Sequence, residues 1–333
     1  MERVSRRVFI TDCEGPITKN DNAAELAEAF IPRGDIFFRK LSLYDDYLAE
    51  VARKKSYKAG DTLRLILPFF KAFGVDDRTV RKFSRRNITM IPQADCMLRE
   101  VLELVPAYIV STSYSPYIQA VCEVLGFPFR NTYSTTVSLD RYELPPEEKN
   151  RLKELHSFIV GLPDFFIPPG AASPDDLPQA DRDTVQRLDE IFWSVLPEME
   201  INRIILEVNP VGGREKAYAI EEIVEAEGAE IRDVFYVGDS ITDVDAFRLV
   251  RAGGGMAVSF NGNDWAIKEA SFAVTAQTAL PIGWLATLFI NQGTRGFQDL
   301  LVTEILPESR QTISEKSCRV RKTVRTEKIG ALG

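Results

Sequence analysis

The stretch that decides the fold is Val8-Phe9-Ile10-Thr11-Asp12-Cys13-Glu14-Gly15-Pro16, an apolar run followed at once by two acidic residues. Residues 8–11 predict a buried strand, because short apolar runs bounded by turn residues are typical of parallel sheets. Asp12 and Glu14 then lie at its carboxyl edge and direct two carboxylates at one crevice. Their repulsion would raise one carboxyl pKa and neutralise that group, so the pair favours a bound divalent cation. A simple turn cap is the alternative for one such pair.

A second acidic strand end strengthens the case for a site. It is Val237-Gly238-Asp239-Ser240-Ile241-Thr242-Asp243, far along the chain. Between the two acidic segments lie a hydroxyl cluster that begins at Ser111 and a lysine, Lys216. The alternatives without a functional role are a helix cap for Ser111 and a surface lysine for Lys216. Thr112 is the reserve candidate for Ser111, and Arg214 for Lys216.

Strands and helices alternate along most of the chain, which predicts an α/β fold with a Rossmann-like open parallel sheet. The expected strands are residues 8–11, 107–110, 203–208, 234–237, 256–259 and 272–274. The expected helices between them are residues 94–105, 116–125, 214–227, 242–250 and 265–270. Ligands of such sheets bind beyond the carboxyl ends of the strands, where both acidic clusters and Ser111 are expected.

Two segments interrupt the alternation and are read as insertions into a core made of residues 1–18, 92–139 and 203–306. Residues 19–91 show helical periodicity without a convincing strand, so we expect a helical cap domain. Residues 140–202 contain two helices around a proline-rich loop and form a second insertion or lid. Residues 307–333 have little apolar periodicity and several basic residues, and we expect a basic, mobile tail.

Composition excludes several classes of protein. The net charge of -8 argues against a nucleic-acid binder, which normally carries a basic surface. The longest apolar stretch, residues 280–290, is shorter than the roughly 20 residues of a membrane span. The N-terminus shows no secretion signal, so we expect a cytoplasmic protein. The 4 cysteines lack zinc or redox spacing, and the single histidine, His156, leaves proton transfer to carboxylates or lysine.

In their order and strand contexts, Asp12 with Glu14, Ser111, Lys216, and Asp239 with Asp243 resemble the motifs of haloacid dehalogenase (HAD) superfamily phosphatases. The segment Ile109-Val110-Ser111-Thr112-Ser113-Tyr114 and the inserted cap are similar to the phosphoserine phosphatase branch. A looser resemblance is to archaeal proteins described as subunit R of energy-converting hydrogenase A, which have a glutamate in the first motif. Glu14 departs from the superfamily, which normally has aspartate there.

The resemblance implies a role for each matched residue in phosphoryl transfer. Asp12 is the expected nucleophile and Glu14 the acid and base, while Ser111 or Thr112 and Lys216 bind the phosphoryl oxygens. The implied cofactor is Mg²⁺, held by Asp12, Asp239 and the Glu14 carbonyl, with Asp243 in support. Asp21 is expected near the substrate by its position alone. The extra methylene of Glu14 moves the carboxyl group, and such misplacement can cost about a hundredfold in rate.

These observations leave three functions open. The first is a magnesium-dependent phosphatase acting on a small phosphorylated metabolite, with the cap selecting the substrate. The second is a weakly active or non-catalytic accessory subunit of a redox (hydrogenase) complex, in which a protein partner is expected. The third is phosphotransfer to an acceptor other than water, which the fold does not distinguish from hydrolysis.

Overall fold

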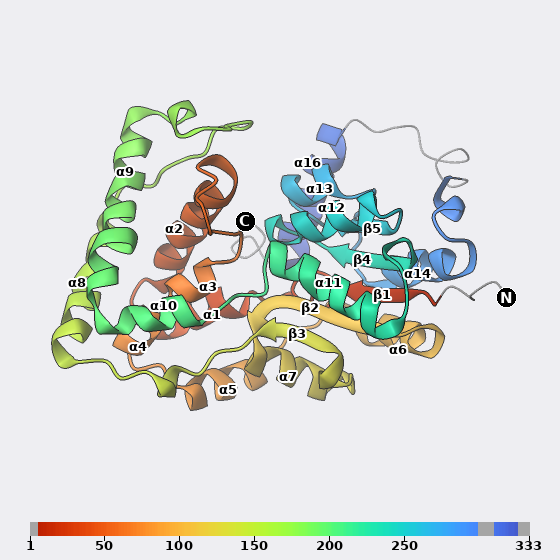
Figure 1. Cartoon of the computed structure of the whole chain (residues 1–333), viewed down its shortest axis with the longest axis horizontal. Helices are drawn as coiled ribbons and strands as arrows, with labels where there is room; N and C mark the ends of the chain where they lie inside the picture. The colour runs from red at the N-terminus through yellow and green to blue at the C-terminus, as the bar shows by residue number, and fades with distance from the viewer. Residues whose placement is uncertain (1–5, 299–309, 326–333) are drawn as a thin grey trace.

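The computed structural model describes residues 6–298 and 310–325 of the chain, and its core is a six-stranded sheet. All neighbouring strands are parallel, and their order is β3-β2-β1-β4-β5-β6 (Figure 1). The strands are β1 (Val8–Thr11), β2 (Ala107–Tyr114), β3 (Thr132–Thr135), β4 (Val234–Gly238), β5 (Met256–Phe260) and β6 (Phe272–Val274). The α/β fold with an open parallel sheet is therefore confirmed.

Helices cover both faces of the sheet, and successive strand residues point to opposite faces. Phe9 packs with α6 (Ala94–Leu104), α7 (Ser115–Leu125) and α14 (Leu280–Gln292). Val8 and Ile10 pack instead with α11 (Arg214–Glu227), α12 (Val244–Ala252) and α13 (Asp264–Glu269). Because both faces are buried, the strands read as continuous apolar runs, which is why they are visible in the sequence.

The strand order reverses at β1, which places a crevice between the carboxyl ends of β1 and β4. The chain moves from β1 outward to β2 and β3, and then returns to pair β4 with the other side of β1. Ligands of doubly wound sheets bind at such a switch point. Asp12 directly follows β1 and Asp239 directly follows β4, so the topology brings the two acidic segments to this crevice.

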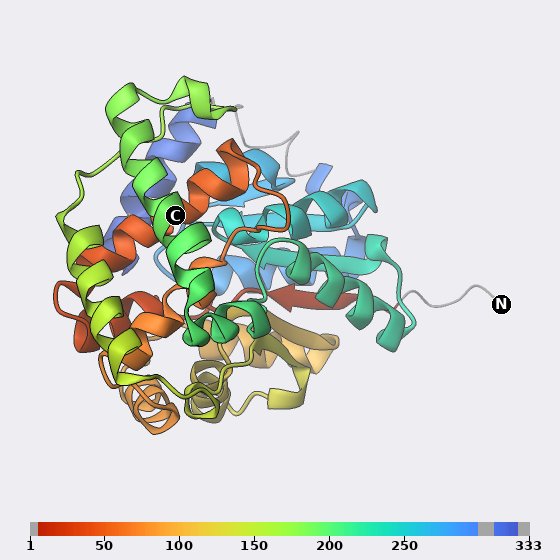
Figure 2. The same ribbon diagram turned by 60° about the vertical axis from the view of Figure 1, so that its left-hand side comes forward.

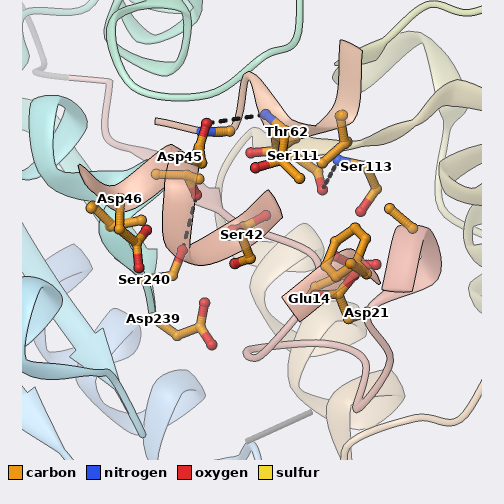
Figure 3. A pocket seen from close by; sticks show the side chains of 18 of the residues that line it. Glu14, Asp21, Ser42, Asp45, Asp46, Thr62, Ser111, Ser113, Asp239 and Ser240 are labelled. Carbon is orange, nitrogen blue, oxygen red and sulfur yellow. Dashed lines mark hydrogen bonds between the residues drawn. The ribbon is translucent and has the colours of Figure 1, made fainter. Parts of the chain in front are cut away.

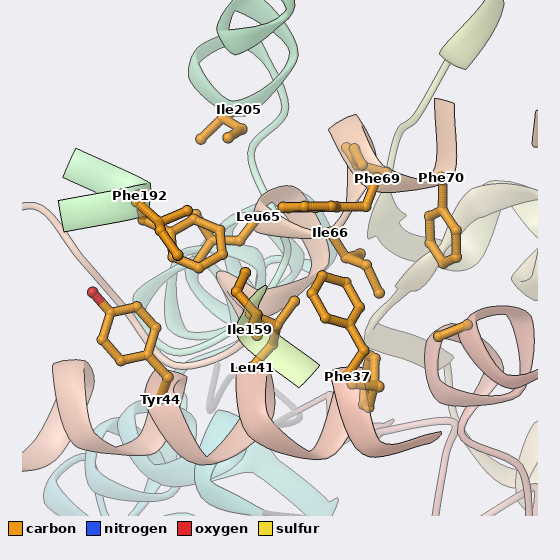
Figure 4. Packing of buried hydrophobic residues seen from close by; sticks show 14 of the residues in the cluster. Phe37, Leu41, Tyr44, Leu65, Ile66, Phe69, Phe70, Ile159, Phe192 and Ile205 are labelled. Carbon is orange, nitrogen blue, oxygen red and sulfur yellow. The ribbon is translucent and has the colours of Figure 1, made fainter. Parts of the chain in front are cut away.

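The two insertions share one hydrophobic core. The first contributes α1 (Asn22–Phe30), α2 (Gly34–Asp46), α3 (Thr62–Leu65), α4 (Leu67–Ala72) and α5 (Asp77–Arg86). The second contributes α8 (Pro146–Gly161) and α9 (Gln179–Glu190), which Figure 2 brings forward. Phe37 and Phe69 of the first pack with Ile159 and Phe192 of the second (Figure 4). The segments 19–91 and 140–202 thus pack as one helical cap.

A loop of the cap reaches the carboxyl edge of the sheet and is held by Asp45. This buried carboxylate accepts hydrogen bonds from the Tyr57 hydroxyl at 2.6 Å, from Gly60 N at 2.8 Å and from Thr62 N at 3.0 Å. Gly60 has φ +92°, and a Cβ there would lie 2.8 Å from Cγ2 of Thr112. Glycine is therefore needed where the cap loop meets β2.

Two secondary-structure predictions are wrong. Residues 203–208, expected as a strand, form the helix α10 (Arg203–Glu207). The β-branched pair Ile204 and Ile205 suggested a strand, but Ile201, Ile204, Ile205 and Val208 are all buried at helical spacing and pack in the cap core. The strand β3 was not predicted, because its residues are polar and mostly half-buried at the sheet edge.

The prediction of a mobile tail is also wrong for residues 310–325, which form the helix α16 (Arg310–Arg325). The rest of the predicted tail lies outside the described residues. Helix α16 packs against α13, and Val324 enters the same hydrophobic cluster as Phe9 of β1. Its buried face also carries Ser317, Arg321 and Arg325, which apolar periodicity does not count. Among the described residues, no helix has the length and apolar character needed to cross a membrane.

Candidate active site

Asp12 lies at the centre of the crevice with both carboxylate oxygens anchored. Its side chain is 4% exposed; Oδ1 accepts the backbone N–H of Cys13 at 2.6 Å, and Oδ2 accepts Nζ of Lys216 at 2.6 Å. Burial raises the pKa of Asp12 to about 7, with Lys216 opposing this shift and Asp243 and Asp239 adding to it. A carboxylate with fixed orientation and raised basicity can attack an electrophile.

Lys216 joins Asp12 to Asp243 in a fully buried network. Nζ of Lys216, which is 0% exposed, also donates to Oδ1 of Asp243 at 2.7 Å. The Tyr236 hydroxyl donates to the same oxygen at 2.6 Å, and Oδ2 of Asp243 accepts N–H of Asp239 and Ser240. Burial alone would lower the pKa of Lys216, but the two carboxylates outweigh burial and raise it. The ammonium group therefore stays charged.

Asp239 forms ion pairs with two arginines of α16. Nη1 of Arg321 donates to the Asp239 carbonyl oxygen at 3.0 Å and to its Oδ2. Nη1 of Arg325 donates to the same Oδ2 at 2.9 Å. Both guanidinium groups are almost fully buried, so these charge-assisted bonds are shielded from solvent screening. Neither arginine was predicted as a site residue, although Ser317, Arg321 and Arg325 recur every four residues, a spacing that places them on one face of a helix.

Glu14 reaches from the core to the first cap helix. Its Oε1 accepts N–H of Asn22, the first residue of α1, at 2.7 Å. Asp21 caps the same helix by accepting N–H of Ala24 at 3.0 Å, and both carboxyl groups line the pocket. Burial raises the pKa of Glu14 well above its usual value, and the charge of Asp21 adds to this shift. The extra methylene of Glu14, compared with aspartate, thus has a structural role, because it lets the carboxylate reach the N-terminus of α1.

Three consecutive hydroxyl residues of β2, Ser111, Thr112 and Ser113, line the same pocket as Glu14. Figure 3 shows Ser111 and Ser113 there. Oγ of Ser111 accepts N–H of Ser113 at 3.3 Å. Within the described part of the chain, the buried hydroxyl oxygens of Thr112 and Ser113 have no hydrogen-bond partner. Buried hydroxyls without a partner cost free energy, so a polar ligand at this position would satisfy them. Ser111 lies within β2, not after it as expected.

Glycines allow the acidic segments to approach one another closely. A Cβ on Gly15, whose φ is +104°, would lie 2.3 Å from the carboxyl carbon of Asp239. A Cβ on Gly238 would lie 2.3 Å from the carboxyl carbon of Asp243. Both positions therefore exclude a side chain because the neighbouring carboxylates occupy its space.

The donor set fits a hard divalent cation. Carboxylate oxygens of Asp12, Asp239 and Asp243 all lie within 4.8 Å of one another. Magnesium prefers oxygen ligands of this kind. Asp243 already accepts four hydrogen bonds, so it orients Lys216 and the turn after β4, while Asp12 and Asp239 are the better candidate ligands.

The structure brings together the predicted residues Asp12, Lys216, Asp239 and Asp243, and it places Glu14, Ser111 and Thr112 around the same pocket. Asp21 lines this pocket as expected from its position. Besides the two arginines, sequence analysis missed the lining contributed by the cap, which includes Ser42, Asp45, Asp46 and Thr62. Nothing local marks these residues, because the folding of the cap alone brings them to the site.

Comparison with solved structures finds a relative that matches along almost the whole chain. No family model and no curated protein matches the sequence. The solved structure of gene product AF1437 from Archaeoglobus fulgidus matches with a TM-score of 0.86 and 30% sequence identity, over 98% of this chain and 99% of that chain. A phospho-aspartyl intermediate analogue of phosphoserine phosphatase matches with a TM-score of 0.50 and 14% identity, over 84% of this chain and 97% of that chain. The second likeness shows a shared α/β fold.

Proposed function

This chain belongs to the same family as gene product AF1437 of Archaeoglobus fulgidus, and from its site we propose that it is a magnesium-dependent phosphatase. The substrate is a small phosphate monoester, hydrolysed through an aspartyl-phosphate on Asp12. The observation that carries this proposal is the buried contact of Lys216 with both Asp12 and Asp243 at the carboxyl ends of β1 and β4. That arrangement supplies a fixed nucleophile and a fixed cation at a ligand-binding switch point.

The first step forms a bond between Asp12 and phosphorus while the bond from phosphorus to the substrate oxygen breaks. Lys216 and the hydroxyls of Ser111, Thr112 and Ser113 bind the phosphoryl oxygens, on which negative charge is spread. Asp12 and Asp239 would hold the magnesium ion, which supplies positive charge to the phosphoryl group when bound. The unpartnered hydroxyls of Thr112 and Ser113 support this cradle, because a bound phosphoryl group satisfies both.

Glu14 moves the proton in both steps. Its raised pKa favours the protonated form, which can donate a proton to the departing substrate oxygen. The resulting Glu14 carboxylate then takes a proton from a water molecule that attacks phosphorus and releases Asp12. Each step leaves the proton on a defined oxygen, and Glu14 returns to its starting state.

Hydrolysis of p-nitrophenyl phosphate, with and without Mg²⁺, tests this proposal. We expect turnover that requires the metal and that falls about 10⁴-fold or more in Asp12→Asn, since loss of a nucleophile removes the covalent route. Asp245→Asn is the matched control, because Asp245 is not among the residues that line the pocket. Full activity in Asp12→Asn would contradict the proposal. An added alcohol that captures the phosphoryl group would reassign the activity to phosphotransfer.

A second candidate is an accessory subunit of a redox complex, in keeping with the looser resemblance to a hydrogenase subunit, which stays a prediction. The observation that favours it is the pairing of Asp239 with two arginines, which opposes metal binding. Purification of the chain with a partner complex, together with no turnover at any Mg²⁺ concentration, supports this candidate. Metal-dependent turnover of the isolated chain argues against it.

A further inference from the structure

Helix α16 brings two guanidinium groups to the carboxylate that a metal ion would need. Oδ2 of Asp239 accepts hydrogen bonds from both Arg321 and Arg325, and these side chains are 4% and 6% exposed. A buried carboxylate oxygen that already accepts two cationic donors has little capacity left for a third positive group. The arginines and a divalent cation therefore compete for the same carboxylate.

The formal charges of the group formed by Asp12, Asp239, Asp243 and Lys216 balance once the two arginines of α16 are counted. Asp12, Asp239 and Asp243 can contribute three negative charges, and Lys216 contributes one positive charge. Two arginines supply the remaining two positive charges, which is the charge that one magnesium ion would bring. Adding the metal without moving the arginines would bring cations together at short range in a buried site, where their repulsion is weakly screened.

The contacts that hold α16 reach the core and the connection to the cap. Oγ of Ser317 donates to the carbonyl oxygen of Gly262 at 2.6 Å, which anchors the helix beside α13. Nε of Arg325 donates to the carbonyl oxygen of Lys19 at 3.0 Å. Nη2 of the same side chain donates to the carbonyl oxygen of Asn20. Lys19 and Asn20 lie between the β1 motif and α1 of the cap. Arg325 therefore links Asp239 to the segment from which the cap begins.

We propose that α16 is a built-in ligand of the active site, whose Arg321 and Arg325 compete with the divalent cation for Asp239. With the helix docked, the arginines occupy the position of the cation, and Arg325 holds the segment at Lys19 and Asn20 that leads to the cap. With the metal bound, both arginines leave Oδ2 of Asp239. This inference rests on the proposed function only in its choice of metal, since the competition itself concerns binding and needs no turnover.

Binding of Mn²⁺ to the full chain, measured by calorimetry, tests the competition directly. The double variant Arg321→Gln, Arg325→Gln should bind Mn²⁺ about tenfold or more tightly than the unaltered chain, because a competing docked state lowers apparent affinity. Arg319→Gln is the control, because Arg319 is exposed on the same helix. It should leave the affinity unchanged. Equal or weaker binding by the double variant, or no binding by either chain, overturns the proposal.

Hydrogen exchange of the unaltered chain provides a second measurement that does not depend on a variant that folds. Saturating Mn²⁺ should increase amide exchange in α16 while α14, on the same face of the sheet, stays protected. Unchanged exchange in α16 at saturating metal overturns the proposal. Tighter Mn²⁺ binding by the double variant without hydrolysis would refute only the phosphatase function. Metal-dependent hydrolysis with equal affinities would refute only the competition.

Discussion

The two neighbouring carboxylates of the crevice are neutralised in different ways. Asp12 is paired with Lys216, which comes from α11 within the core and is enclosed with Asp243 and Tyr236. Asp239 is paired with Arg321 and Arg325, which come from a helix that follows the last strand of the sheet. We call Asp12 with Lys216 the lysine side, and Asp239 with Arg321 and Arg325 the arginine side. The cation of the lysine side belongs to the core, whereas the two cations of the arginine side depend on the docking of α16.

Under the proposed competition, a single site combines a permanent charge with a displaceable one. Lys216 cannot leave without leaving two buried carboxylates unpaired, which costs several kcal/mol. Helix α16 contributes no strand to the sheet, so its release, as proposed above, would leave the strand order unchanged. The lysine side should therefore govern stability and the arginine side should govern access to the site.

The largest effect is expected from Lys216→Met. This change keeps the length of the side chain but leaves Asp12 and Asp243 without their buried cation, so the free energy of unfolding should fall by about 3 to 5 kcal/mol. Urea denaturation measures this loss. Arg321→Met leaves Asp239 paired with Arg325 and should cost less. An equal loss in both variants would break the distinction between the two sides.

Glu14→Gln tests proton transfer next to the arginine side. The amide cannot donate the proton that the leaving oxygen needs, so kcat/KM, which reports the step that releases this oxygen, should fall about a hundredfold for an alkyl phosphate. The fall should be smaller for p-nitrophenyl phosphate, whose leaving group needs little protonation. Comparison of the two substrates measures the effect. Equal losses with both would contradict the role of Glu14 as the acid.

Tyr236→Phe gives a smaller change on the lysine side. It removes the hydroxyl donor to Asp243 and should lower the free energy of unfolding by about 1 to 3 kcal/mol, because the acceptor stays buried. Tyr108→Phe is the matched control, since it removes a hydrogen bond to Glu227 in a less buried setting. Chemical denaturation of both variants provides the measurement. A larger loss in the control would show that Tyr236 adds little to the network.

The smallest effect is a pH dependence that arises in the cap, away from both sides. His156 packs edge-on against Phe37 and Phe73, and burial lowers its pKa below the usual value. The unfolded chain then binds more protons, so the stability contributed by neutral His156 is complete above about pH 6.5 and declines as the pH falls below it. Denaturation of the unaltered chain and of His156→Phe at about pH 8 and about pH 5.5 isolates this decline, because Asp12, with its pKa raised to about 7, contributes a change of the opposite sign to both chains.

His156→Phe should reduce that decline, because phenylalanine does not titrate. The comparison separates acid sensitivity of the cap from protonation of the site carboxylates. An equal change of stability with pH in both chains would place the effect outside His156.

Sequence alone predicted the parts of the fold that local patterns encode. The bounds of β1, β6 and α11 agree with prediction, because apolar runs and helical periodicity mark them. Asp12, Lys216, Asp239 and Asp243 converge because each lies at a strand end or at the start of a helix. Ile204 and Ile205 misled prediction, since isoleucine favours strands and only the packing of the cap selects the helix.

The arginine side was not predictable in the same way. The face of α16 that contacts the site is polar, so apolar periodicity gave no sign of burial there. Arg321 and Arg325 become buried only because Asp239 compensates their charge, and that partner lies far away in the chain. Long-range charge pairing of this kind is set by tertiary structure and leaves little trace in local composition.

Mass spectrometry of the acid-quenched chain after brief turnover of a phosphate monoester tests the central claim most directly. The account predicts one phosphoryl group on the peptide that contains Asp12, and none in Asp12→Asn. A chain that hydrolyses the substrate with Mg²⁺ but carries no phosphoryl group on Asp12, or carries it on another residue, would contradict the account.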